Sequence, residues 1–196
     1  MGLDEYVLGL LAIISGLAIS ELVAELHRLL FHRKAIQWHW LAPLTAFYVA
    51  IAILASWWVA WGSFHARTDP IPFGMFLLPV AQLVALFLAA RGILPADLSA
   101  DGGGKFDLER HYFLVKRYVW GAMTADGLLV LASGAVSRAI EPMARHEVEL
   151  PLLSMAIATS AWALLALSNN RWLHRLLVPA LVLWLLVTSV GVTISP

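Results

Sequence analysis

The chain has 196 residues, of which 61% are hydrophobic and 13% are charged, and its net charge is zero. A soluble domain carries about a quarter charged residues, so this composition excludes an ordinary soluble domain and places the chain in a lipid bilayer. Lys and Arg lie at the ends of apolar runs, which argues against nucleic acid as a partner. The absence of cysteine excludes disulfides, thiolate catalysis and cysteine-based metal sites.

Six apolar segments reach the length of about 20 helical residues needed to cross the hydrocarbon core. They lie near residues 6–30, 40–64, 73–94, 112–140, 150–168 and 172–194. Because backbone amides in lipid must be satisfied within each segment, we expect an all-α polytopic integral membrane protein. It would form a single bundle of six transmembrane helices. Asp107 is the predicted N-cap of the fourth helix.

Lys and Arg are distributed unevenly among the five connections. The first, third and fifth connections carry ten of them, and the second and fourth carry three. Basic connections remain on the cytoplasmic side, so we expect both termini outside, in a multi-pass protein of the bacterial inner membrane. Tryptophans near segment ends, Trp120 among them, are interpreted as anchors at the membrane interface.

Small residues recur at every fourth position in the first segment, and a similar pair occurs in the fourth. Such ridges let two helices approach closely, so the pattern predicts that these two segments pack together at the centre of the bundle. The residues concerned are Ala12, Gly16, Ser20, Ala24, Gly121 and Ala125.

Short matches link the two halves of the chain. IISGLAIS in the first segment is similar to LASGAVS in the fourth, and LLPVAQLV in the third is similar to LVPALVLW in the sixth. Because the charge distribution gives the halves opposite orientations, a weak inverted three-helix repeat is one interpretation. Chance matches among small apolar residues are the alternative.

The candidates for buried polar residues within the apolar segments are Glu21, Glu25, Gln82 and Asp126. An ionised side chain near the bilayer centre costs about 2.5–3.5 kcal/mol, so such groups are paired, protonated or functional. At 1.5 Å per residue, Glu21 lies about 13 Å and Asp126 about 18 Å above the inner ends of their segments. We therefore expect these two carboxyl groups at similar depths.

Two interpretations of these residues remain open. In the functional one, Glu21 and Asp126 form a buried carboxylate pair that carries a proton or coordinates a cation. In the structural one, Glu25 forms an ion pair, and Glu21 extends a network that pins the first segment to the fourth. The partners considered for the ion pair are Arg28, Lys116 and Arg117.

The sequence predicts neither a metal site nor a cofactor, because its histidines lack the spacing of metal ligands. The sequence leaves open whether a lipid or pigment is bound between the helices. Ser133, in ASGAV, resembles the serine segment of rhomboid intramembrane proteases. However, the sixth segment has no histidine beyond His174 to act as a base, so we expect no catalytic residue.

The stretches SGLAISELVAELHRLL, ILASWWVAW and DLERHYFLVKR follow one another along the chain. Their order resembles a group of uncharacterised bacterial six-helix inner-membrane proteins. That group has a small-residue first helix ending in a basic patch, a tryptophan-rich second helix and an acidic element leading into the fourth. The resemblance implies a membrane bundle and no activity. Glu109 and His111 are interpreted as surface residues at the membrane edge.

We expect a non-catalytic membrane subunit or scaffold that associates with itself or with another membrane protein. The reason is that the segments offer packing faces but little internal polarity. The alternative is a proton- or cation-coupled transport or channel protein that uses the carboxylates of the first and fourth segments.

Overall fold

The computed structural model describes residues 3–65, 73–98, 105–140 and 145–190, and over these residues the fold is helical, as expected. The six helices are α1 (Leu3–Phe31), α2 (Leu41–His65), α3 (Phe73–Ile93), α4 (Leu108–Ile140), α5 (Arg145–Leu167) and α6 (Arg171–Val190). A short 3-10 turn, η1 (Arg33–Ala35), follows α1.

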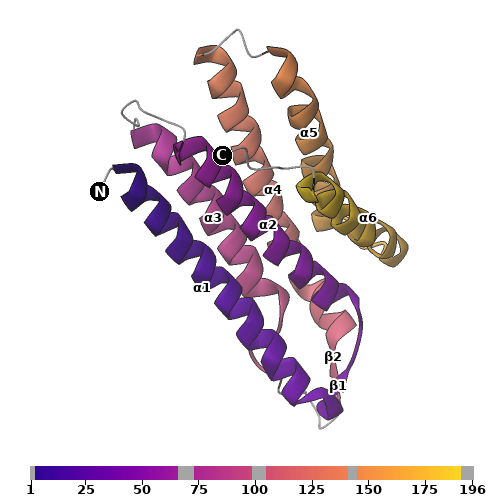
Figure 1. The fold of residues 1–196 in the computed structure, drawn as a ribbon. Helices are drawn as coiled ribbons and strands as arrows, with labels where there is room; N and C mark the ends of the chain where they lie inside the picture. Colours follow the sequence, from indigo (N-terminus) through magenta and orange to yellow (C-terminus); the bar gives the residue numbers. More distant parts are fainter. Residues whose placement is uncertain (1–2, 66–72, 99–104, 141–144, 191–196) are drawn as a thin grey trace.

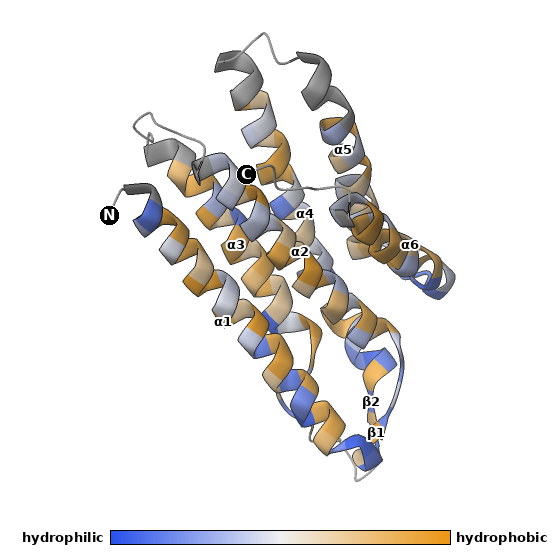
Figure 2. Cartoon of the chain, viewed as in Figure 1, coloured by the Kyte–Doolittle hydropathy of each residue, from blue (hydrophilic) through white to orange (hydrophobic). Residues whose placement is uncertain are grey.

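Five of these helices, α1 to α4 and α6, are long and apolar enough to cross a membrane. The apolar part of α5, Pro151–Leu167, is shorter than the others. Of the six expected spans, the described residues therefore provide five of full length. Apolar residues cover most of each helix, and polar residues gather near the lower helix ends (Figure 2).

The helices form a bundle in which α1 lies at one edge and α5 and α6 lie at the other (Figure 1). α1 packs against α2 and α3, whereas α4 packs against α3 and α5, and α6 packs mainly on α2. The predicted central pairing of the first and fourth helices was therefore wrong. α3 lies against both of these helices instead.

The predicted small-residue ridges do not form contacts between helices of this chain. Ala12, Gly16, Ser20 and Ala24 all face outwards, and Ala125 is also exposed. A Cβ atom added at Gly16 or Gly121 would meet no neighbouring atom within 4 Å.

Two other glycines, Gly127 and Gly92, lie where neighbouring helices approach each other closely. A Cβ atom at Gly127 of α4 would collide with Thr159 and Trp162 of α5, and one at Gly92 of α3 would collide with Tyr118 of α4. The helices therefore meet most tightly where the sequence pattern had not indicated it.

A two-residue parallel bridge departs from the purely helical expectation. β1 (Ile36–Gln37) pairs with β2 (Phe106–Asp107), with Ile36 opposite Phe106 and Gln37 opposite Asp107. The bridge ties the connection after α1 to the start of α4.

The predicted N-cap at Asp107 is confirmed. Its Oδ1 accepts hydrogen bonds from the backbone amides of Glu109, at 2.9 Å, and Arg110, at 3.0 Å. These bonds satisfy two of the free amides at a helix start, so α4 begins at Leu108 rather than near Tyr112.

Trp120 is a core residue, and its predicted place at the membrane interface was wrong. It is fully buried, and its ring centroid lies 6.0 Å from that of Tyr48 in α2. Its indole N–H donates to the hydroxyl of Tyr112 at 3.0 Å. A buried partner for the N–H is what allows a tryptophan to sit this deep.

Candidate functional site

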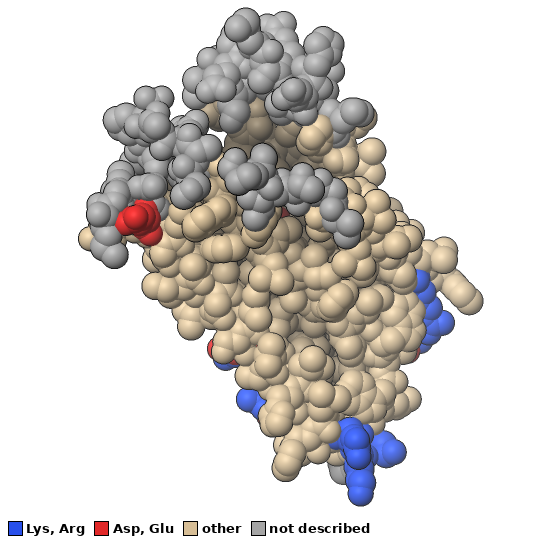
Figure 3. Space-filling view, viewed as in Figure 1, with Lys and Arg blue, Asp and Glu red and all other residues tan. Residues whose placement is uncertain are grey.

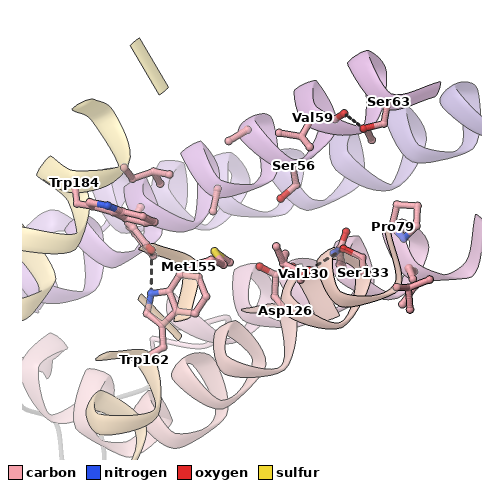
Figure 4. Close-up of a pocket in the computed structure, with 18 residues that line it drawn as sticks. Ser56, Val59, Ser63, Pro79, Asp126, Val130, Ser133, Met155, Trp162 and Trp184 are labelled. Carbon is pink, nitrogen blue, oxygen red and sulfur yellow. Dashed lines mark hydrogen bonds between the residues drawn. The ribbon is translucent and has the colours of Figure 1, made fainter. Parts of the chain in front are cut away.

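A cavity of about 550 Å³ lies among α2, α3, α4, α5 and α6 (Figure 4). Most of its lining is apolar or aromatic, which is typical of small-molecule sites. Its polar lining comes from five side chains in addition to the aromatic residues Tyr48, Trp162 and Trp184. These five are Ser56, Ser63, Gln82, Asp126 and Ser133.

Asp126 is the charged residue of this cavity. On α4, Asp126, Val130 and Ser133 are spaced four and three residues apart, so they share the helix face that lines the cavity. Asp126 is only 4% exposed, and its Oδ1 has no hydrogen-bond partner among the described residues. A buried acceptor left unpaired costs about 1–3 kcal/mol, and more if it is ionised. Such a group inside a helix that is long and apolar enough to cross a membrane is therefore a candidate functional residue.

Hydroxyl groups add oxygen acceptors to the cavity wall. Ser63 Oγ donates to the carbonyl of Val59 at 2.9 Å, and Ser133 Oγ donates to the carbonyl of Val130 at 2.8 Å. Because each hydroxyl hydrogen is used within its own helix, the lone pairs of these oxygens remain free to accept. Ser56, on α2, faces the Asp126 side of the cavity (Figure 4).

Aromatic side chains form the wall at one end of the cavity. The indole N–H of Trp162 in α5 donates to the hydroxyl of Tyr48 in α2 at 2.9 Å. The two ring centroids are 6.3 Å apart, in an edge-on arrangement. Trp184 of α6 lies at the same end (Figure 4). This bond ties α2 to α5 and fixes the position of two rings that face the cavity.

Glu21 and Glu25 of α1 belong to a separate ionic cluster. Glu25 accepts a hydrogen bond from Arg28 at 2.8 Å, which confirms that predicted pair, and Arg91 of α3 lies 3.8 Å away. Glu21 forms an ion pair with Arg91. Arg28 also donates to the carbonyl of Ala96, after α3. Two acids and two bases therefore compensate one another between α1 and α3.

The predicted pair of Glu21 and Asp126 was wrong. Both residues lie inside apolar helices, but α1 packs on α3, which presents Arg91 to Glu21. The network does pin α1 to a neighbour, as the structural interpretation held, but the neighbour is α3. Of the four polar residues predicted to matter, the structure brings Asp126 and Gln82 together in the cavity and leaves Glu21 and Glu25 outside it.

Lys116 does not pair with Glu25. Its side chain is almost fully buried, and its ammonium group donates to the carbonyls of Ala166, at 3.2 Å, and Ser168. These carbonyls lie at the end of α5, where the last turn of a helix has no internal donors. Lys116 thus caps α5 from the side. The predicted partner Arg117 is exposed, and Glu25 is paired with Arg28 and Arg91 instead.

A buried hydrogen-bond chain continues from the same carbonyl. His174 Nε2 lies 3.0 Å from the carbonyl oxygen of Ser168, and its Nδ1 lies 2.7 Å from the hydroxyl oxygen of Tyr112. Because a carbonyl only accepts, Nε2 carries the hydrogen of a neutral His174, and the Tyr112 hydroxyl donates to Nδ1. The chain links α4 to the start of α6. The sequence offered only single polar residues at segment ends as a signal for it.

Glu109 is also more than a surface residue. It accepts a hydrogen bond from Arg175 at 3.4 Å and lies 3.8 Å from both Arg171 and His39. Its side chain is 20% exposed, and these contacts make it a link between α4, α6 and the segment before α2. On the face shown in Figure 3, Lys and Arg lie towards the lower part of the bundle, and the middle carries almost no charge.

No group of three or more His, Cys, Asp or Glu side chains that could hold a metal ion occurs among the described residues. The candidate site consists of Asp126 and the cavity around it.

No protein-family model, no curated protein and no solved structure matches the chain.

Proposed function

We propose that the protein is a proton- or cation-coupled membrane transport protein in which Asp126 binds the cation. One observation carries this proposal: a buried carboxyl group without a hydrogen-bond partner on Oδ1 lines a cavity of about 550 Å³. In an apolar environment, a proton or a cation removes the cost of leaving this acid uncompensated.

Glu21 has no part in this mechanism. Its carboxylate is already compensated by Arg91, and its side chain is 36% exposed. Gln82 supports the proposal because an amide carries both an acceptor and donors, and it lines the cavity with Asp126. We assign Gln82 the role of a neutral ligand to the bound cation.

The proposal includes a location in the bacterial inner membrane with both termini outside. The uneven distribution of Lys and Arg among the connections supports this orientation. α2 runs from Leu41, near the basic end, towards His65, so Ser63 lies near the opposite end of the bundle. In this orientation, the Ser63 side of the cavity faces away from the cytoplasm.

The test is ion flux in liposomes that contain the purified protein. Under an imposed potential, we expect Asp126→Asn to lower proton or monovalent cation flux at least about tenfold, because the amide cannot compensate a positive charge. Glu21→Gln serves as the matched control, since it also neutralises one acid in an apolar helix. It should retain flux.

Equal flux in liposomes that contain equal amounts of the wild-type protein and of the Asp126→Asn variant would contradict the proposal. Circular dichroism and elution volume in detergent establish that each variant is folded. A comparable loss in Glu21→Gln would assign the effect to stability and would also count against a specific role of Asp126.

A second candidate is a non-catalytic scaffold that associates with itself or with another membrane protein. The exposed ridge on α1, formed by Ala12, Gly16, Ser20 and Ala24, supports it, because no helix of this chain covers these residues in the described structure. Small residues on an open helix face let a second helix approach closely.

Self-association in mild detergent tests this candidate. We expect Gly16→Ile to shift the protein from oligomer to monomer in analytical ultracentrifugation, because the new side chain blocks the ridge, where an added Cβ atom meets no neighbouring atom within 4 Å. Leu17→Ile, at an exposed position beside the ridge, is the control. A wild-type protein that is monomeric and isolates without a partner would rule the scaffold out.

A further inference from the structure

We infer that the ligand of the cavity is a protonated amine with an apolar body. The inference rests on the proposed role of Asp126 as the group that accepts the cation, and it names the chemical class that the cavity selects. Four properties of the cavity carry it, namely its charge, the kind of hydrogen-bonding groups it presents, its aromatic wall and its size.

The charge of the lining favours a single positive group. Asp126 is the acid among the lining residues, and among the residues whose side chains the structure describes, no Lys, Arg or His lines the cavity with it. Two bases of the described helices are engaged elsewhere: Arg91 with Glu21 and Glu25, and Lys116 with the end of α5. An anionic ligand would meet like charge without compensation, and a divalent ion would lack the several oxygen ligands that it prefers.

The hydrogen-bonding groups favour a ligand that donates. The Ser63 and Ser133 hydroxyls spend their hydrogens on the carbonyls of Val59 and Val130, so they present acceptors. Asp126 adds carboxyl oxygen as a further acceptor. A protonated amine brings up to three N–H donors for these acceptors, whereas a quaternary ammonium has none.

The aromatic wall suits the apolar part of such a ligand. Tyr48 and Trp162 are held in place by their mutual hydrogen bond, and Trp184 lies at the same end of the cavity. Aromatic faces attract a nearby cation as well as apolar groups. Met155 also lines the cavity and supplies an adaptable apolar surface.

Size separates an organic cation from a bare metal ion. The volume of about 550 Å³ lies within the range of about 300–1,000 Å³ that is typical of sites for drug-sized molecules. A sodium ion at Asp126 would leave most of this apolar space unfilled. An amine with an apolar body both compensates the acid and covers the apolar walls.

Binding of two matched probes to the full-length protein in nanodiscs tests the inference. The probes are 4-phenylbutylamine, which is positively charged, and 4-phenylbutan-1-ol, which has the same body and no charge. By calorimetric titration, we expect Asp126→Asn to bind the amine about tenfold or more weakly than the wild type does. The alcohol should bind both proteins within about twofold, because it makes no charge contact.

Two further variants keep the test independent of folding. Ala55→Phe places a large side chain in the cavity while Asp126 stays in place, so it should weaken the binding of both probes. Glu21→Gln neutralises an acid outside the cavity and should bind both probes as the wild type does. Amine binding that is unchanged in Asp126→Asn, or amine binding no tighter than alcohol binding in the wild type, overturns the inference.

The flux assay separates this inference from the transport role. Asp126-dependent flux of protons or sodium without amine binding would contradict the assignment of an amine as the ligand and would support the transport function. Asp126-dependent amine binding without flux supports the ligand class and removes the transport role. A wild-type protein with neither property overturns both.

Discussion

The ammonium group of Lys116 in α4 lies 3.2 Å from the carbonyl oxygen of Ala166, in the last turn of α5. The same group also donates to the carbonyl of Ser168. A charge that is only 2% exposed is thus stabilised by backbone dipoles instead of by an acid. This contact closes the end of α5 and positions the connection that leads into α6.

Replacing Lys116 with Met should lower the free energy of unfolding by about 2 kcal/mol, because two buried carbonyls lose their charged donor. Thermal unfolding of the purified protein in detergent measures the change. Arg117→Met removes a neighbouring exposed base and should change stability by less than about 0.5 kcal/mol. Equal effects of the two substitutions would contradict the capping role of Lys116.

Substitution by alanine should change the stability of the protein in opposite directions at Gly127 and Gly121. Gly127→Ala brings a methyl group against Thr159 and Trp162 of α5, so we expect a loss of about 1–3 kcal/mol. Gly121→Ala meets no neighbour within 4 Å and should be neutral or stabilising by up to about 1 kcal/mol. Unfolding midpoints of both variants give the comparison, and a stable Gly127→Ala protein would argue against this packing of α4 on α5.

Arg91 and Glu21 should show energetic coupling between α1 and α3. Their side chains are 49% and 36% exposed, so solvent screening limits the coupling to about 1 kcal/mol. A double-mutant cycle with Arg91→Gln and Glu21→Gln measures it from unfolding free energies. Strictly additive effects would show that the pair contributes nothing to stability.

The parallel bridge predicts a specific cross-link. Neighbouring strands lie about 4.8 Å apart, which is within the Cα separation that a disulfide requires. The double variant Ile36→Cys with Phe106→Cys should therefore oxidise to an intramolecular disulfide, detected as a faster band on a non-reducing gel. The chain contains no other cysteine, so each single variant is a clean control. Failure to cross-link under mild oxidation would contradict the pairing of Ile36 with Phe106.

Local signals in the sequence predicted the helices well, although α4 and α5 begin four or five residues earlier than expected. Apolar runs mark the helices because a membrane-length run of such residues has few other stable conformations. The Asp107 cap and the pair of Glu25 with Arg28 involve residues two or three positions apart. Interactions of this kind depend only on local geometry, which the sequence contains directly.

The choice of neighbours could not be predicted in the same way. The estimated depths of Glu21 and Asp126 were similar, yet depth says nothing about which helix lies alongside α1. Arg91 is the last-turn base of α3 and pairs with α1, and no local spacing connects it to Glu21, 70 positions earlier. The small-residue ridge identified a surface that permits close approach, not the helix that would use it. The cavity combines side chains from five helices and has no sequence signature of its own.

The pairing of Glu21 with Arg91 has a consequence for the biogenesis of the protein. The two residues are 70 positions apart, so α1 leaves the ribosome well before its counter-charge in α3 has been synthesised. During that interval, two acids of α1 have only Arg28 as a basic partner in the pairs seen here. The Glu21 carboxylate therefore acquires the cation with which it pairs only after α3 has been synthesised.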